Sequence, residues 1–357
     1  MGTTGTPRRL VVGAVLAGLV AWTVVSAATG KGGYPNGEIL VTGPWLRSHL
    51  RDPGLVIVDV RADKDFDGRV IPGALRLPWS AFRENDPVRD LGGLFVGAAA
   101  AQQVLGRHGV ARTDTVVLYD SVKKDGGAVA SYVFWVLDLL GHPSVKVLER
   151  GLDGWVDAGG EVVSEPARPE PVTYQAPAAE VRLRRWADGE FLRARLGDPV
   201  YQVLDVRSAP EYLGEKANAT LSGREEKRGH VPGAYNVDYR LNWTDPDRKA
   251  VRPYGELLEL YRGLDPARPV IVYCHSGRRA SFGYFVLRLL GFDDVLLYDG
   301  SWMEWGHPDR FFPVETTPRE LRGALPVPGR KAAAEPRGAG RGRPAARAEG
   351  GYISCGG

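Results

Sequence analysis

One cysteine in this sequence stands where nucleophilic chemistry is expected. Cys274 follows the apolar run 270–273 and begins the polar segment Cys274–Arg279, which reads Cys-His-Ser-Gly-Arg-Arg. The apolar run predicts a buried parallel strand, and the sequence after Ser281 predicts a helix. Cys274 would then lie at the carboxyl end of a strand, where open α/β sheets bind ligands. A buried structural cysteine does not usually begin so polar a loop, so we interpret Cys274 as a nucleophile.

The residues after Cys274 favour its ionised form and the binding of an anion. Backbone N–H groups of the turn and of the following helix N-terminus would point into one concavity. Gly277 would allow a positive φ in that turn. Together with two arginines, these donors should favour a thiolate, which is a nucleophile suited to an anionic substrate. The predicted substrate-binding residues of the loop are His275, Ser276, Gly277, Arg278 and Arg279.

The elements that would position this loop occur twice in the chain. The segment 55–61 matches 203–207, and the segment 116–119 matches 270–273. In each copy, short β-branched runs alternate with helix-forming segments, which predicts an α/β domain with a mainly parallel sheet flanked by helices. Residues 164–180 contain four prolines and are predicted to link the two copies.

Several motifs of the two copies resemble tandem rhodanese sulfurtransferases. The resemblance covers roughly residues 38–315. It rests on the cysteine loop and on three further motifs. These are VIPGA at 70–74, GHVPGA at Gly229–Ala234 and YDGSWMEW at Tyr298–Trp305. The fold class implied is α/β, with two tandem rhodanese-like domains.

The resemblance implies a division of labour between the domains. Residues 38–163 would form a silent domain, and residues 181–318 the catalytic one. Asp120 stands where Cys274 should be repeated, in a loop four residues longer, so the first domain cannot form a persulfide. Its implied role is structural, walling the cleft between the domains.

The resemblance also implies the reaction. The Cys274 thiolate would take the sulfane sulfur of thiosulfate, release sulfite, and pass the sulfur from a persulfide to cyanide or a thiol. No metal or organic cofactor is implied. The implied partners are a small sulfur donor and a thioredoxin-like or other thiol acceptor protein. The family's arginine equivalent to Arg207 faces the substrate, and a structural ion pair with a nearby carboxylate is the alternative for it.

Three other functions stay open at this point. In 3-mercaptopyruvate sulfurtransferases the loop is typically neutral, whereas the two arginines here suit a dianionic donor, although the charged insert 214–228 could supply a further arginine. Related phosphatases place an arginine six residues after the cysteine, where this chain has Ala280. The last alternative is a non-catalytic sulfur carrier or binding protein.

Both ends of the chain differ from the middle. Nineteen uncharged residues, Leu10–Ala28, follow two arginines, so residues 1–28 are predicted to be a signal peptide or an N-terminal membrane anchor. Either would place the rest outside the cytoplasm, in a periplasmic, secreted or membrane-anchored form. Residues 326–357, which include Cys355, are predicted to form a disordered basic tail.

The net charge of +3 comes from these ends, so the folded part carries no nucleic-acid-binding signal. Two cysteines exclude a disulfide scaffold.

Overall fold

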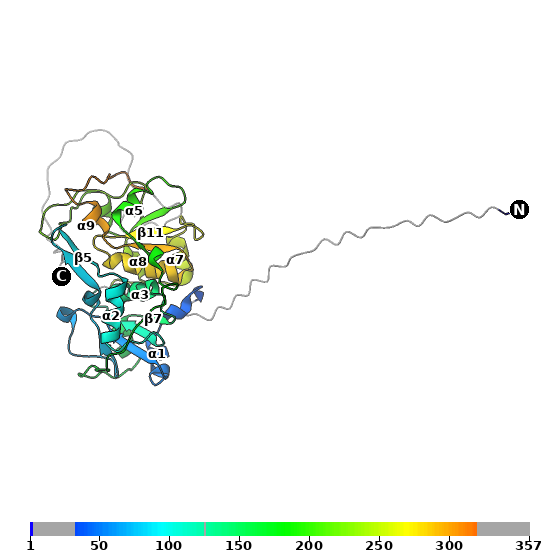
Figure 1. Ribbon diagram of the computed structural model, residues 1–357, viewed down its shortest axis with the longest axis vertical. Helices are drawn as coiled ribbons and strands as arrows, with labels where there is room; N and C mark the ends of the chain where they lie inside the picture. Colours follow the sequence, from blue (N-terminus) through cyan, green and yellow to red (C-terminus); the bar gives the residue numbers. More distant parts are fainter. Residues whose placement is uncertain (3–32, 125, 320–357) are drawn as a thin grey trace.

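The computed structural model describes residues 33–124 and 126–319, together with Met1 and Gly2. It shows two α/β domains, drawn in Figure 1 from blue to cyan and from green to orange. The first contains β1 (Leu40–Val41), α1 (Gly43–His49), β2 (Leu55–Asp59), β3 (Leu75–Arg76), β4 (Arg83–Asp86), β5 (Leu91–Phe95), α2 (Ala98–Arg107), β6 (Thr115–Tyr119), α3 (Ala128–Leu139), β7 (Val145–Leu148) and α4 (Gly151–Asp157). The second contains β8 (Trp186–Ala187), α5 (Gly189–Arg193), β9 (Gln202–Asp205), α6 (Ala209–Tyr212), β10 (Tyr235–Asn236), α7 (Tyr254–Leu260), β11 (Val270–Tyr273), α8 (Arg278–Leu289), β12 (Val295–Tyr298) and α9 (Ser301–Trp305). Short 3-10 turns lie at Gly37–Ile39, Asp63–Asp65, Trp79–Phe82, Leu183–Arg185 and Tyr239–Asn242.

Each domain is built on a five-stranded parallel sheet, and the two sheets have the same strand order. The first runs β1-β7-β6-β2-β3 and the second β8-β12-β11-β9-β10. β6 and β11 are therefore the central strands, and both are β-branched and almost wholly buried. This confirms the predicted pair of mainly parallel α/β domains.

Helices α3 and α8 pack against each other between the two sheets (Figure 1). The rings of Phe134 and Phe285 meet edge to face, with centroids 5.0 Å apart. Helix α8 is buried on nearly all sides. The reason is that one face lies on its own sheet while another is covered by α3. On the sheet side, a Cβ at Gly283 would meet the Val206 side chain at 3.0 Å, so this glycine lets α8 sit close to the strands.

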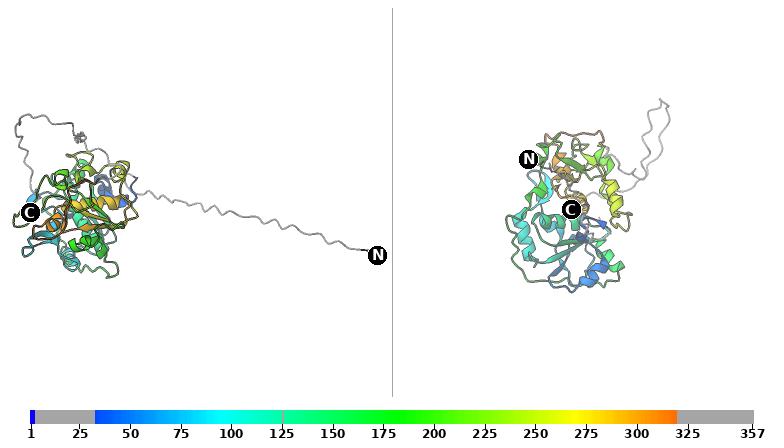
Figure 2. Two further views of the ribbon diagram at one scale, coloured as in Figure 1. Left: turned by 90° about the horizontal axis from the view of Figure 1, so that it is seen from above. Right: turned by 90° about the vertical axis from the view of Figure 1, so that its right-hand side faces the viewer.

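Two segments tie the domains together further. The β4–β5 hairpin of the first domain reaches α9 of the second, as Figure 1 shows, and the Gly92 N–H lies 3.0 Å from the Met303 sulfur. The linker 164–180 follows the first domain, where Val172 N–H bonds the Gly106 carbonyl at 2.8 Å. Figure 2 shows the two domains as adjoining lobes from a second direction.

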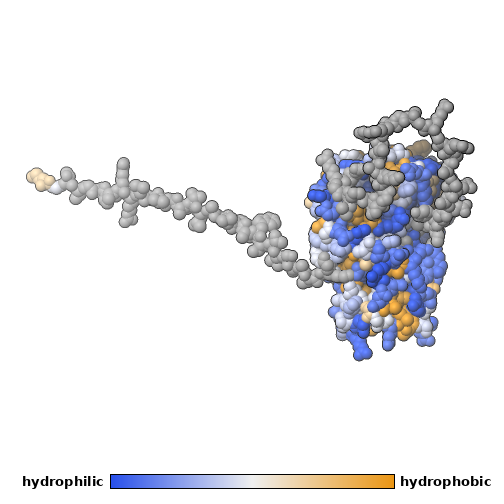
Figure 3. Space-filling view, turned by 180° about the vertical axis from the view of Figure 1, so that it is seen from behind, coloured by the Kyte–Doolittle hydropathy of each residue, from blue (hydrophilic) through white to orange (hydrophobic). Residues whose placement is uncertain are grey.

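Several sequence predictions fall outside the described residues. These are the N-terminal segment Leu10–Ala28, the tail 326–357 and Cys355. Within the described ranges, no helix is long and apolar enough to cross a membrane. The face of the molecule seen in Figure 3 is mostly hydrophilic, with separate apolar patches.

Candidate active site

Cys274 lies directly after the central strand of the second sheet. It follows β11 and is only 1% exposed, with no disulfide partner among the described residues. The turn is shorter than expected, because α8 already begins at Arg278 and the turn proper is Cys274–Gly277. Both arginines of the motif are therefore in the first helical turn. Gly277 has φ +83°, as predicted, and a Cβ there would lie 2.4 Å from Oδ1 of Asp299.

The start of α9 holds this turn from one side. The Ser301 Oγ accepts the N–H groups of Cys274 and Gly277, both at 3.1 Å, and donates to the Tyr298 carbonyl at 2.7 Å. In the opposite sense, the N–H groups of Trp302 and Met303 bond the first two carbonyls of the turn at 3.0 and 2.9 Å. The YDGSW motif is thus the segment that fixes the cysteine turn.

The first domain holds the turn from the other side. The Arg83 guanidinium, which lies over the Trp79 ring, donates to the Ser276 carbonyl at 2.6 Å. Asp299, beside Gly277, accepts the Phe95 N–H at 2.6 Å and the Tyr132 hydroxyl at 3.0 Å. The first domain therefore contributes directly to the geometry of the cysteine turn.

Asp299 is a fully buried carboxyl group at this junction. Burial raises its pKa to about 6, against the opposing effects of the Arg83 charge and of its own hydrogen bonds. The carboxyl group thus titrates near neutral pH in the contact between the domains.

The two arginines of the motif have different surroundings. Arg279 makes a bidentate ion pair with Glu211, with N–O distances of 2.8 and 2.9 Å, and is only 9% exposed. Burial alone would raise the pKa of Glu211, but hydrogen bonds from Arg279 and Ser208, with the Arg279 charge, hold it well below its usual range. Arg279 thus holds α6 to α8. Its binding of the substrate's anionic end stays a prediction. Arg278 is half-buried at the first position of α8.

Arg207 is held by an ion pair at the end of β9. Its side chain is 1% exposed, bonds Asp205 at 2.6 Å and the Gly229 carbonyl at 2.7 Å, and lies over the Trp302 ring. The ion pair left open as an alternative is therefore what the structure contains. These bonds pack the strand end against the GHVPGA turn. Substrate contact by Arg207 stays a prediction.

His275 is buried and contacts the charged insert. Its Nε2 lies 2.9 Å from Oε1 of Glu226, which is 2% exposed. The insert's arginines do not face the turn, because Arg224 pairs with Asp309 and Arg228 pairs with Glu225 at the surface. The insert thus brings a carboxylate to the cysteine turn, where the sequence suggested an arginine.

The loop after β6, which corresponds to the cysteine turn, is filled by its own side chain. The Asp120 carboxylate accepts the Gly127 N–H at 2.9 Å and the Ala130 N–H at 3.3 Å. An internal carboxylate therefore occupies the amide-lined concavity after β6.

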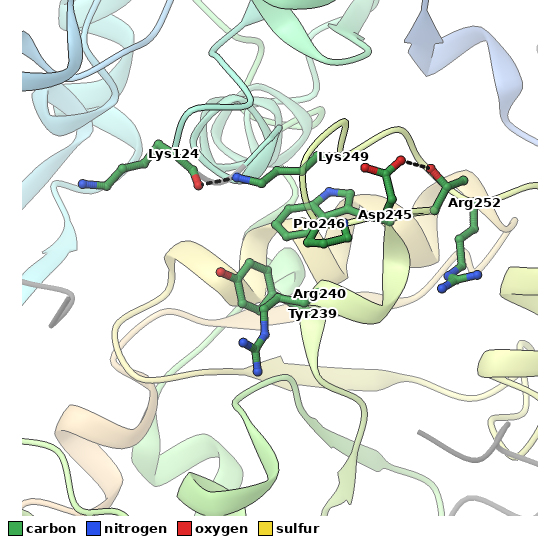
Figure 4. Close-up of a pocket in the computed structure, with 9 residues that line it drawn as sticks. Lys124, Tyr239, Arg240, Asp245, Pro246, Lys249 and Arg252 are labelled. Atoms are coloured by element: carbon green, nitrogen blue, oxygen red, sulfur yellow. Dashed lines mark hydrogen bonds between the residues drawn. The ribbon is translucent and has the colours of Figure 1, made fainter. Parts of the chain in front are cut away.

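A pocket of about 300 Å³ opens next to this loop of the first domain (Figure 4). Apart from Lys124, its lining comes from the segment 239–252 of the second domain. This segment contacts the first domain, just as the β4–β5 hairpin of the first domain contacts the second. Lys249 reaches the loop and donates to the Lys124 carbonyl at 2.7 Å. The ring of Trp243 lies against Phe282 of α8, with centroids 5.6 Å apart. Cys274 is not part of this pocket's lining.

The fold and the single cysteine loop define a class of protein. Two parallel-sheet domains of equal topology follow each other in the chain, one with a cysteine after its central strand and one with an aspartate there. Residues 42–158 and 189–307 each match the rhodanese-like domain family. The chain belongs to the rhodanese family, and it is a sulfurtransferase of that family.

Individual relatives agree with this assignment. The chain is 36% identical over 298 residues to a thiosulfate sulfurtransferase of Corynebacterium glutamicum, covering 79% of this chain and 92% of that protein. It is 32% identical to the sulfur carrier protein TtuD of Thermus thermophilus, covering 77% and 96%. An ergothioneine biosynthesis enzyme from Chlorobium limicola shares the fold, with a TM-score of 0.66 and 23% identity over 82% of this chain and 72% of that one.

Sequence reasoning missed several residues that shape the site. Arg83 and Glu226 carry no motif signal, because each reaches the turn from a segment distant along the chain. Ser301 and Asp299 lie in the YDGSW motif, which indicated the family but not their contacts. Glu211 is also distant from Arg279 along the chain, so no local pattern indicates their pairing.

Proposed function

We propose that this protein is a thiosulfate sulfurtransferase that works through a persulfide on Cys274. The observation that carries the proposal is the position of Cys274. It lies at the end of the central strand β11, in a four-residue turn before the twelve-residue helix α8. The positive end of a helix dipole favours both a thiolate and the anion that it attacks.

The proposed reaction has two sulfur-transfer steps. The Cys274 thiolate attacks the outer, sulfane sulfur of thiosulfate. A new S–S bond forms on the protein, the S–S bond of thiosulfate breaks, and sulfite leaves with its electron pair. An acceptor nucleophile then attacks the outer sulfur of the persulfide and returns the thiolate.

In this proposal, two groups of the protein bind the charged end of the donor. The first is the N-terminal turn of α8, whose backbone dipoles point toward the turn. The second is Arg278, the arginine of the motif that is more exposed than Arg279. Arg279 supports the donor site through its pair with Glu211. A dianion such as thiosulfate gains more from this field than the singly charged carboxylate of 3-mercaptopyruvate.

Thiocyanate formation from cyanide tests the donor. Wild type and Cys274→Ser would be compared with thiosulfate and with 3-mercaptopyruvate at equal concentrations. We expect the larger kcat/KM with thiosulfate and no turnover by the serine variant. A larger kcat/KM with 3-mercaptopyruvate would keep the nucleophile and overturn the donor assignment.

A sulfur carrier is the second candidate, favoured by the 32% identity to TtuD. A carrier and an enzyme differ in turnover. A carrier loads one sulfur atom and discharges it to a dedicated protein, so cyanide would yield about one thiocyanate per chain. Sustained turnover with cyanide would exclude the carrier as the sole role.

A further inference from the structure

The insert 214–228 brings the carboxylate of Glu226 into contact with His275, the residue that follows the nucleophile. Glu226 Oε1 lies 2.9 Å from Nε2 of His275. The other oxygen of Glu226 is buried and has no hydrogen-bond partner in the described part of the chain. Burying a carboxylate that is 2% exposed and has a single hydrogen-bond partner reduces the stability of the folded protein. This cost points to a use for the pair beyond packing.

Backbone hydrogen bonds already hold both residues in place. The Glu226 N–H bonds the Asn218 carbonyl at 3.0 Å, and the next residue, Lys227, bonds the Gly306 carbonyl through its N–H at 2.7 Å. The His275 carbonyl accepts the Met303 N–H at 2.9 Å. The side-chain pair is therefore not needed to fix the backbone of either segment.

The pair has the parts of a base supported by a carboxylate. With Glu226 ionised, Oε1 accepts the Nε2–H of His275, and the lone pair of the imidazole is on Nδ1. No hydrogen bond reaches Nδ1 from the residues that the structure describes. A carboxylate behind the ring orients it and stabilises the imidazolium that forms when Nδ1 takes a proton.

We propose that His275, positioned by Glu226, deprotonates a thiol acceptor, so that the acceptors of this site are weakly acidic low-molecular-weight thiols. The inference rests on the proposed Cys274 persulfide. The first half-reaction needs no base, because thiosulfate carries no proton to remove. Sulfite as an acceptor needs none either. A thiol does, because its S–H must ionise before it attacks.

The step balances without an oxidant or a reductant. Nδ1 of His275 takes the proton of the acceptor S–H, and the acceptor sulfur attacks the outer sulfur of the persulfide. A new S–S bond forms on the acceptor while the S–S bond to Cys274 breaks, and its electron pair stays on Cys274 as thiolate. The acceptor leaves as a persulfide and recovers the proton from His275.

The test follows the second half-reaction alone. In a Cys355→Ser background, Cys274 is loaded with sulfur by inorganic polysulfide, and the excess is removed. Discharge is then timed with 2-mercaptoethanol and, separately, with sulfite. The variants are Glu226→Gln and His275→Gln. The matched control is Glu225→Gln, since Glu225 is adjacent, exposed and paired with Arg228.

We expect each of the two variants to slow discharge to 2-mercaptoethanol by about 100-fold, the usual size of a general-base contribution. Discharge to sulfite should stay unchanged, and the control should match wild type with both acceptors. The variants' rate with 2-mercaptoethanol should also rise with pH in step with the thiolate fraction, because the thiol must then ionise in solution.

Two results would overturn the inference. An equal loss with both acceptors would make Glu226 and His275 positioning residues only, and no loss with 2-mercaptoethanol would leave the pair without a part in transfer. Loading with polysulfide separates this test from the proposed function. If thiosulfate fails to load Cys274 but discharge follows the expected pattern, the donor assignment fails and the base assignment stands.

Discussion

At the scale of single residues, the cysteine turn depends on groups that tolerate little change. Gly277 has a positive φ and lies against Asp299, so it combines two requirements that only glycine meets. Its role follows from the local sequence, because a polar turn between a strand and a helix needs such a residue. The contacts of Asp299 with the first domain do not follow from the local sequence, because they join residues more than 160 positions apart.

Gly277→Ala should therefore disturb the turn. The added Cβ would lie 2.4 Å from Oδ1 of Asp299, and a positive φ is unfavourable for alanine. We expect a loss of about 1–3 kcal/mol in the free energy of unfolding, together with a larger loss of activity. Urea unfolding and the thiocyanate assay would measure both. Gly255→Ala is the matched control, because no atom lies within 4 Å of a Cβ there.

The Asp299 carboxyl group should make stability depend on pH. Its pKa is raised from 3.8 to about 6 in the folded protein, so the folded state binds this proton more tightly than the unfolded chain does. Its contribution to stability is complete below pH 3.8 and is lost as pH rises through about 6. The full difference corresponds to about 3 kcal/mol.

Asp299→Asn removes this titration and provides the test. The stability of wild type relative to the variant should fall between pH 4.5 and pH 7.5, as measured by urea unfolding at both values. If the difference between the two proteins is the same at both pH values, Asp299 does not titrate in this range in the folded state.

At the scale of elements, the site is assembled from segments that the sequence places far apart. The strand, the turn and α8 follow from the local pattern and were predicted. The β4–β5 hairpin and the insert 214–228 were not placed, because neither has the periodicity of a strand or helix that packs on its own sheet. Their positions are set by contacts with the other domain and with α9.

Arg83→Ala tests whether the hairpin end supports the cysteine turn. The change removes the donor to the Ser276 carbonyl and the contact with the Trp79 ring. We expect kcat to fall about tenfold or more, the effect of losing one charged hydrogen bond, with little change in KM for thiosulfate. Arg89→Ala is the control, because Arg89 is an exposed residue of the same hairpin that pairs with Asp86. An unchanged kcat in Arg83→Ala would show that the turn keeps its geometry without the first domain.

At the scale of the whole molecule, the two domains form one packed unit. The equal strand orders were expected from the internal repeat, which a duplicated sequence pattern makes visible. The packing of α3 on α8 was not expected, because the apolar pattern of a helix does not indicate which element covers the face that points away from its own sheet. The consequence is that the first domain covers apolar surface that the second domain would otherwise expose.

Phe134→Ala in the first domain should thus destabilise the second as well. The Phe134 ring is buried against Phe285 of α8, and large-to-small changes of this kind cost about 3–5 kcal/mol. We expect a single unfolding transition at a lower urea concentration, with activity lost in the same transition. Two separate transitions, with activity surviving the first, would show that the domains are energetically independent.

The proposed reaction requires a persulfide on Cys274, and mass spectrometry measures it directly. The protein would be incubated with thiosulfate without an acceptor, alkylated and digested. We predict that the Cys274 peptide gains the mass of one sulfur atom, that cyanide removes it, and that Cys274→Ser shows no gain at that position. If Cys274 stays unmodified while thiosulfate is consumed, sulfur does not pass through this cysteine, which contradicts the proposed reaction.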